Sequence, residues 1–498
     1  MVAVLCAAIG VPGIAHAGCK EVLAALGNTV VDVTCAPSAD LTTKNPTTTP
    51  ADNSIPGLPP GAFTPTTDRG VISNGPAEIT KAVPGLQING RFADDPDKEA
   101  RFLLRLPNDW NGSLVVAGAS GTRSEFNGDF AWSDYVVQKG YAYASQNKGV
   151  LNLKITSLDS ATPPTPLSCR LKPDSRVWVE FFDNDAVLEP GHIPSKPFTQ
   201  WTQYLIEATG LAKQAVKARY NHFPRRTYAV GTSNGGYQVR RALETAPELF
   251  DGGVDWEGTF VDALGPNILI DLPPAIRNWP DYVASGFNPN SQAARNIVAA
   301  GYPPDMPGTP LTFWGRYWTQ FWEVTQCQWQ KRFDPAWTTY NDGPNDVTGT
   351  GGYTYYDRIV KDPSIAARVA AIATTGNIKR PLVTVAGTMD ALLPIKHGAR
   401  AYEALVAEHG RDRDAGGGRS PQYRLYEVQN GNHIEAYKTL FPDKLELIQP
   451  LAQNAFDRLV DHVESGALLP ASQCIPRGKT TLADQPSQPG HCANLLVP

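Results

Sequence analysis

The residues best suited to chemistry lie in the segment Gly231-Thr232-Ser233-Asn234-Gly235, which has the form Gly-x-Ser-x-Gly. An apolar run at 226–230 precedes it, and a helical pattern over 234–248 follows. A serine on such a strand-to-helix turn has its hydroxyl exposed above a sheet, and the flanking glycines relieve crowding there. Gly236 would let the helix approach the sheet closely. This context predicts that Ser233 is a nucleophile.

A serine hydroxyl is a weak nucleophile near neutral pH, so it needs a general base and a carboxylate that orients the base. Asp390 follows the strand-like run 381–387, and His433 follows the strand-like run 423–428. An aspartate near a helix start is often only an N-cap, and a lone loop histidine is often only a surface group. The order Ser, Asp, His at successive strand ends nevertheless favours a catalytic triad.

The tetrahedral intermediate of acyl transfer needs two N–H donors for its oxyanion. The residue after the nucleophile supplies one in this kind of site, which is Asn234 here. The other is expected from the small-residue loop that follows an early strand, at Ala119 or Ser120. We expect neither a metal nor a cofactor.

Four further residues are candidates for the substrate pocket. Trp256 and Glu257 end the strand after the elbow helix, and Trp318 and Trp322 belong to a tryptophan-rich segment. Aromatic side chains often line ligand sites, although packing in a core accounts for many tryptophans and a solvated loop for many glutamates.

Strand and helix patterns alternate around these residues. Short apolar runs typical of buried strands occur at 101–106, 113–118 and 141–145, and apolar residues recur at helical spacing over 197–220. Between 265 and 377 proline-rich and tryptophan-rich stretches replace the alternation. We therefore predict an α/β fold, an α/β-hydrolase core with a mainly parallel sheet and a large inserted lid. The predicted ranges are 100–264 and 378–466 for the core and 265–377 for the lid.

The two ends of the chain differ from the core in composition. The apolar segment 2–15 and Ala15-His16-Ala17 resemble a signal peptide over 1–17, which predicts a secreted or periplasmic protein, although the basic start of such a peptide is missing. Residues 18–99 are interpreted as an N-terminal arm with a disulfide loop, extended over the Thr- and Pro-rich stretch 36–75, and 467–498 as a disulfide-bearing tail.

Seven cysteines become six if Cys6 leaves with the signal peptide. An even set in an exported protein indicates disulfides, and Cys19 with Cys35 and Cys474 with Cys492 look like local loops. Cys169 and Cys327 would then form a pair, although other pairings are possible. A lipid-modified Cys19 is an alternative that His16 fits badly.

Charge excludes one class of partner. The net charge is −5, and the Lys and Arg residues are scattered, so the basic stripe needed for nucleic-acid binding is missing. No stretch is long and apolar enough to span a membrane. The composition leaves the oligomeric state open.

Three segments resemble the tannase and feruloyl esterase family. They are Leu106-Pro107-Asn108-Asp109-Trp110-Asn111-Gly112, Val115-Val116-Ala117-Gly118 and Gly140-Tyr141-Ala142-Tyr143-Ala144-Ser145. The resemblance implies an exported carboxylic ester hydrolase that acts on bulky or aromatic esters beneath a lid. Members of that family carry cysteines directly before the nucleophile and directly after the catalytic histidine, where this chain has Thr232 and Ile434. The calcium loop of many family lids is also missing. These departures leave hydrolases of hydroxyalkanoate oligomers or synthetic polyesters open as relatives.

The sequence therefore favours a serine ester hydrolase (EC 3.1.1 type) that uses Ser233, Asp390 and His433 on a small-molecule or oligomeric ester. A peptidase or amidase on the same core is an alternative, because both reactions use the same acyl-enzyme chemistry. A catalytically inactive binding protein is a third reading, and it would leave the triad unexplained.

Overall fold

The structure is a computed structural model of the 498-residue chain. It describes residues 16–50, 72–96, 98–121, 123–150, 154–158, 177–180, 198–334, 355–409, 423–487 and 490–498. The predicted signal peptide, apart from its last two residues, and Cys169 lie outside these ranges.

Among the described residues, ten strands form one sheet in the order β1-β2-β3-β5-β4-β8-β9-β10-β11-β12. Their bounds are β1 Val30–Ser38, β2 Gly85–Phe92, β3 Arg101–Pro107, β4 Ser113–Gly118, β5 Ala142–Gln146, β8 Arg226–Thr232, β9 Gly252–Trp256, β10 Leu382–Gly387, β11 Tyr423–Val428 and β12 Gln473–Ile475. The apolar runs of the sequence become strands because both faces of the sheet are covered, so nearly every residue of β3, β4 and β10 is buried.

The sheet changes from antiparallel to parallel along its width. β1, β2, β3 and β5 pair antiparallel, and the strands from β5 through β12 pair parallel. β5 lies between β3 and β4, which reverses the chain order of two strands. This topology, with a nucleophile turn after β8, is that of the α/β-hydrolase fold.

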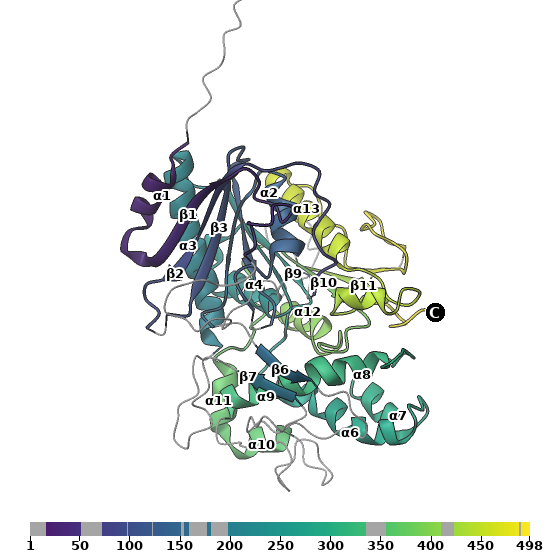
Figure 1. The fold of residues 1–498 in the computed structure, drawn as a ribbon. Helices are drawn as coiled ribbons and strands as arrows, with labels where there is room; N and C mark the ends of the chain where they lie inside the picture. The colour runs from purple at the N-terminus through teal and green to yellow at the C-terminus, as the bar shows by residue number, and fades with distance from the viewer. Residues whose placement is uncertain are drawn as a thin grey trace, which may run out of the picture.

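Helices cover the two faces of the sheet (Figure 1). One face packs on α3 (Thr199–Tyr220), α4 (Asn234–Thr245) and α12 (Ala399–Glu408), and α1 (Cys19–Leu26) lies outside α3. The other face packs on α2 (Asp134–Val137) and α13 (Gln449–Ser465). None of the helices in the described part of the chain combines the length and apolar character that a membrane span requires.

The described part of the segment between β9 and β10, where the alternation of strand and helix patterns is lost, is helical. It contains α5 Ile268–Asp271, α6 Pro273–Ala284, α7 Gln292–Ala299, α8 Phe313–Tyr317, a π-helix Trp318–Trp322, α9 Glu323–Phe333, α10 Tyr355–Lys361 and α11 Pro363–Ala370. Helices α6 to α11 gather at one end of the sheet, next to the strands β6 Lys154–Leu158 and β7 Val177–Glu180 (Figure 1). We call α5 to α11 the helical cap. Its buried side chains form one apolar cluster with Met389, Leu392 and Ile434 of the sheet-end loops.

The N-terminal region differs from the predicted arm. Strands β1 and β2 join the main sheet, so the sheet begins well before residue 100. In the described part of the stretch 36–75, Thr43 donates to Asp134 and Thr49 donates to Asp129. The prediction of an extended surface arm is wrong for residues 39–50, because their hydroxyls satisfy buried carboxylates that would otherwise lack partners.

Within the described part of the chain, two disulfides join Cys19 to Cys35 and Cys474 to Cys492. Both confirm the predicted local loops. The first links α1 to β1, and the second ties the C-terminal tail to β12. The predicted pair of Cys169 and Cys327 falls outside the described part of the chain, because Cys169 does.

Candidate active site

Ser233 lies at the turn between β8 and α4. Its backbone has φ 58° and ψ −123°, a left-handed conformation that a side chain rarely adopts. Its N–H donates to the Trp256 carbonyl at 2.8 Å, and its carbonyl accepts from the Tyr237 N–H at 3.0 Å. Neighbouring backbone therefore holds the strained turn from both sides, which is the geometry of a nucleophile elbow.

Glycines allow three backbone segments to meet beneath this turn. A Cβ atom built on Gly235 would lie 2.1 Å from the Gly118 carbonyl oxygen, and one on Gly231 would lie 2.2 Å from the Gly235 oxygen. One on Gly236 would lie 2.2 Å from a carboxylate oxygen of Asp255. Since Cβ atoms do not approach other atoms this closely, the predicted roles of Gly231, Gly235 and Gly236 are confirmed.

The loops after β10 and β11 also touch through glycine. A Cβ atom on Gly387 would lie 2.3 Å from the Gly431 backbone. The Met389 N–H donates to the Gly431 carbonyl at 2.7 Å. This contact brings together the two loops that carry Asp390 and His433.

Asp390, His433 and Ser233 form a continuous hydrogen-bonded chain. His433 Nδ1 lies 2.7 Å from Asp390 Oδ2, and His433 Nε2 lies 3.0 Å from Ser233 Oγ. The other carboxylate oxygen of Asp390 accepts the N–H groups of Leu392 and Leu393, each at 2.7 Å. All three side chains of the chain are buried. The arrangement can deprotonate Ser233 through His433 while Asp390 fixes the ring.

The structure brings together part of the predicted oxyanion site. Asn234 is the first residue of α4, where backbone N–H groups point outward and favour negative charge. The Ser120 N–H instead donates to Asn127 Oδ1 at 2.8 Å, so it is not turned toward the nucleophile. This hydrogen bond removes Ser120 as the second donor. Ala119 remains next to the elbow, since its carbonyl oxygen would lie 3.0 Å from a Cβ atom on Gly235.

A cavity of about 80 Å³ opens onto Ser233 and His433. Its wall is mainly apolar and neutral, and among the described lining residues Arg123 is the only one with a permanent charge. The lining residues are Ile72, Ser120, Gly121, Arg123, Ser233, Asn234, Thr259, Ile268, Gln320, Phe321, Thr325, Gln328, Trp329, Leu392, Leu393 and His433.

The three tryptophans predicted to line the pocket are not among these residues. Trp256 is fully buried beside Trp132, in the core between the sheet and the helices α2 and α13. Trp318 and Trp322 are buried in the cap cluster, and the Trp322 indole N–H donates to the Ala391 carbonyl at 2.6 Å. These pocket assignments are wrong, because a cap of short helices needs its largest apolar side chains for its own packing.

The residues that line the cavity instead belong to the same segment as Trp318 and Trp322. Phe321, Thr325, Gln328 and Trp329 line the cavity and have the spacing i, i+4, i+7 and i+8. Residues at that spacing share one face of a helix. The helical period of the sequence could have identified this face, but not which face points to the cavity.

Glu257 lies behind the triad rather than in the pocket. One of its carboxylate oxygens accepts the Gly387 N–H at 2.9 Å, and Oε2 lies 3.6 Å from His433 Nδ1. Burial, together with the nearby charge of Asp390, raises the pKa of Glu257 well above its usual range. Glu257, Asp390 and His433 each offer one ligand atom within 4.8 Å of the others, so this trio is also where a metal ion could be held.

The position before the nucleophile is filled without a disulfide. The Trp132 indole N–H donates to the Thr232 hydroxyl at 3.3 Å, and Ile434 is buried in the cap cluster. Thr232 therefore makes a polar contact and Ile434 an apolar contact at the two positions where members of the tannase and feruloyl esterase family carry cysteines.

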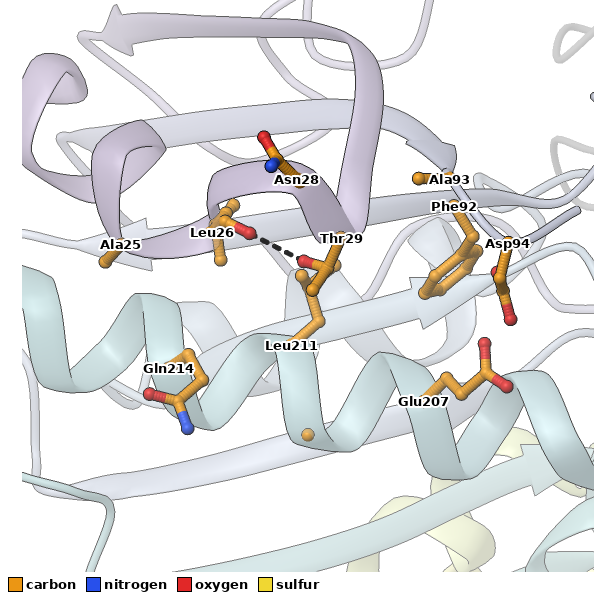
Figure 2. Close-up of a pocket in the computed structure, with 11 residues that line it drawn as sticks. Ala25, Leu26, Asn28, Thr29, Phe92, Ala93, Asp94, Glu207, Leu211 and Gln214 are labelled. Atoms are coloured by element: carbon orange, nitrogen blue, oxygen red, sulfur yellow. Dashed lines mark hydrogen bonds between the residues drawn. The ribbon is translucent and has the colours of Figure 1, made fainter.

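A larger cavity of about 630 Å³, drawn in Figure 2, shares no lining residue with the cavity at the triad. It is lined by residues of α1, the end of β2 and α3, including Leu26, Phe92 and Leu211. Its carboxylates, Asp94 and Glu207, face each other in Figure 2. The described lining contains neither a serine nor a histidine, so volume alone does not locate the active site here.

Comparison with known proteins gives a partial match. Residues 347–495, which carry Asp390 and His433, match the family model of 3HB-oligomer hydrolase. A D-(-)-3-hydroxybutyrate oligomer hydrolase of Burkholderia thailandensis is 36% identical over 120 residues, which are 23% of this chain and 16% of the relative. Its counterpart in Burkholderia mallei is 34% identical over the same shares. The alignment thus spans only about a sixth of the length of these curated relatives.

Solved structures give similarity over most of the chain. Feruloyl esterase B from Aspergillus oryzae aligns with a TM-score of 0.45 and 15% identity, covering 88% of this chain and 87% of the other. Tannin acyl hydrolase from Aspergillus niger aligns with a TM-score of 0.48 and 12% identity, covering 90% and 87%.

Proposed function

We propose that this chain is a serine carboxylic ester hydrolase that cleaves oligomeric esters of hydroxy acids through an acyl-enzyme. The hydrogen-bonded chain from Asp390 through His433 to Ser233 carries the proposal, because it is complete and opens onto a cavity. The order of this chain, from carboxylate to imidazole to hydroxyl, is the order that acyl transfer to a serine nucleophile requires.

The reaction proceeds in two halves. Ser233 Oγ attacks the ester carbonyl carbon and gives its proton to His433 Nε2, which then protonates the departing alcohol oxygen as the C–O bond breaks. Water next attacks the acyl-serine, passes a proton to Nε2, and the carboxylic acid leaves as Ser233 regains its proton. Asp390 holds Nδ1–H and stabilises the imidazolium formed in each half.

The oxyanion of each intermediate binds to backbone N–H groups. We assign one donor to Asn234, at the positive end of α4, and the other to Ala119, in the loop that packs against the elbow. The backbone segments of Asn234 and Ala119 pack closely against each other at Gly235, so we expect little reorganisation when charge develops on the carbonyl oxygen.

Two observations support an oligomeric hydroxy-acid ester as the substrate. The matched relatives are named for hydrolysis of 3-hydroxybutyrate oligomers, and the matched segment here includes two of the three triad residues. The cavity wall is apolar at Ile268, Phe321 and Leu392, which suits methyl-bearing chains, and has neutral amides at Gln320 and Gln328.

We also propose that the protein is exported and works outside the cytoplasm. The disulfides Cys19–Cys35 and Cys474–Cys492 support this location, because such bonds persist in oxidising compartments. The proposed substrate is a small or oligomeric ester rather than a nucleic acid, because the net charge is −5 and the Lys and Arg residues are scattered.

A paired substrate experiment tests the function. We expect the purified protein to cleave 3-hydroxybutyrate trimer and p-nitrophenyl butyrate, and to cleave the matched p-nitroanilide at least about 100-fold more slowly, because an anilide is a less reactive acyl donor than an ester. Product release is measured by chromatography and absorbance.

A fluorophosphonate probe provides the control for this experiment. It should label Ser233 and block both esters, with the site identified by peptide mass spectrometry. Faster cleavage of the anilide would support the peptidase or amidase alternative. Absence of both hydrolysis and labelling would support the inactive binding protein.

A further inference from the structure

The side chain of Asn432 binds the backbone on the far side of the catalytic histidine. Asn432 Oδ1 accepts the Ile434 N–H at 3.1 Å, and Asn432 Nδ2 donates to the Ile434 carbonyl at 3.2 Å. The same Oδ1 accepts the hydroxyl of Tyr317, the last residue of α8, at 2.9 Å. Tyr317, Asn432 and His433 are all buried. Because Asn432 precedes His433 and binds the residue after it, the Tyr317 hydroxyl helps to fix the segment from which the imidazole projects.

A second side chain of the helical cap holds the loop that carries Asp390. The Trp322 indole N–H donates to the Ala391 carbonyl at 2.6 Å. The Ala391 carbonyl and the Leu392 N–H belong to one planar peptide unit. That N–H donates to Asp390 Oδ1 at 2.7 Å. Trp322 therefore fixes one end of the peptide unit whose other end holds the carboxylate of the triad.

A π-helix brings these two cap side chains together. Tyr317 and Trp322 are separated by about 1.4 turns of an α-helix, so an α-helix would direct them to different faces. The segment Trp318–Trp322 is instead a π-helix, a rare geometry in which hydrogen bonds join residues i and i+5. The rings of Tyr317 and Trp322 stack, with centroids 6.5 Å apart and an angle of 27° between their planes. The π-helix thus lets one short segment contact both triad loops.

We propose that Tyr317, Asn432 and Trp322 are positioning residues that orient the histidine and the aspartate of the triad. Through them the helical cap belongs to the catalytic machinery and does more than cover the cavity. This inference rests on the proposed function. In that reaction His433 Nε2 accepts the proton of the serine and then delivers it to the departing alcohol oxygen. A misplacement of about 1 Å can cost such a step about 100-fold in rate, so small shifts of the two loops matter.

The leaving group of the ester separates a positioning role from a merely structural one. An alkoxide needs a proton from His433 as the C–O bond breaks, whereas p-nitrophenolate is a stable anion without one. A misplaced imidazole therefore slows cleavage of ethyl butyrate more than cleavage of p-nitrophenyl butyrate, although both esters transfer the same acyl group. A structural defect that reduces the amount of active protein lowers kcat/KM for both esters by the same factor.

The first comparison uses two tyrosines of the cap. We expect Tyr317→Phe to lower kcat/KM by about 10-fold to 30-fold for ethyl butyrate and by about 3-fold or less for p-nitrophenyl butyrate. Tyr282→Phe is the matched control, because the Tyr282 hydroxyl donates at 2.9 Å to Asp305, in the loop between α7 and α8. It should keep the wild-type ratio of the two esters. Each variant loses one hydrogen bond, so each should lower the midpoint of thermal unfolding by less than about 4 °C.

The second comparison uses two buried tryptophans of the cap. Trp322→Phe keeps an aromatic ring but removes the indole N–H that holds the Ala391 carbonyl. It should lower kcat/KM for ethyl butyrate at least about 3-fold more than for p-nitrophenyl butyrate. Trp314→Phe is the matched control, because the Trp314 indole N–H donates to the Pro303 carbonyl at 2.9 Å, away from both triad loops. It should keep the wild-type ratio.

A double-mutant cycle connects Tyr317 to Asn432. Because the hydroxyl acts through the Asn432 amide, Tyr317→Phe should cost less than about 2-fold for ethyl butyrate in an Asn432→Ala background. An equal cost in both backgrounds would overturn the route through Asn432. The ester ratio of Tyr317→Phe requires no change at Asn432, so it decides the role of Tyr317 even if Asn432→Ala does not fold.

The outcomes separate this inference from the proposed function. If the wild-type protein cleaves both esters, an unchanged ratio in Tyr317→Phe overturns the role of Tyr317, and an unchanged ratio in Trp322→Phe overturns the role of Trp322. The assignment of the triad stands in either case. If the wild-type protein cleaves p-nitrophenyl butyrate but not ethyl butyrate, the inference alone is overturned, because the histidine then fails to protonate an alkoxide. Failure to cleave either ester overturns the proposed function, and the inference with it.

Discussion

Ser233→Ala is expected to lower kcat for ester hydrolysis by about 10^5-fold while leaving the fold intact. The variant lacks Ser233 Oγ, the attacking atom, which lies 3.0 Å from His433 Nε2. No acyl-enzyme can therefore form. Stability should change by less than about 1 kcal/mol, because the turn is held by backbone hydrogen bonds that alanine retains. Hydrolysis of p-nitrophenyl butyrate and thermal unfolding measure the two effects.

A second substitution in the same background sharpens this expectation. Since the triad acts as a unit, Ser233→Ala with His433→Ala should be no less active than Ser233→Ala alone. The exposed Ser465 at the end of α13 is the matched control, and Ser465→Ala should hydrolyse the ester at the wild-type rate. Substantial activity in Ser233→Ala would contradict the assignment of the nucleophile.

Much of the site was readable from the sequence because its signals are local. Ser233, Asp390 and His433 each follow an apolar run that becomes a strand, and parallel strands place their carboxyl ends at one edge of the sheet. The glycines around Ser233 were informative for the same reason, because the tight turn itself requires residues without a Cβ atom.

Features that depend on distant contacts were not readable. β1 pairs with β2 across a long intervening stretch, and a threonine-rich segment looks like surface until its buried aspartate partners are known. Trp318 and Trp322 have the composition of a ligand site, but helical phase decides which face reaches the cavity. Glu257 was assigned to the pocket because the sequence does not reveal its left-handed turn.

The narrow contact between the elbow and β4 leads to the second large expected effect, which is that Gly235→Ala disrupts both stability and catalysis. The new methyl group would lie 2.1 Å from the Gly118 carbonyl oxygen and 2.5 Å from its carbon, and backbone atoms cannot yield as a flexible side chain can. We expect a loss of about 3 kcal/mol in the free energy of unfolding, and a fall of about 100-fold or more in kcat, because Ala119 and the elbow must separate.

Gly210 in α3 is the matched control: a Cβ atom there meets nothing within 4 Å, so Gly210→Ala should stabilise the helix by up to about 1 kcal/mol. Chemical denaturation and ester hydrolysis on both variants decide the matter, and equal stability of the two would contradict close backbone contact as the reason that glycine is required beside Ser233.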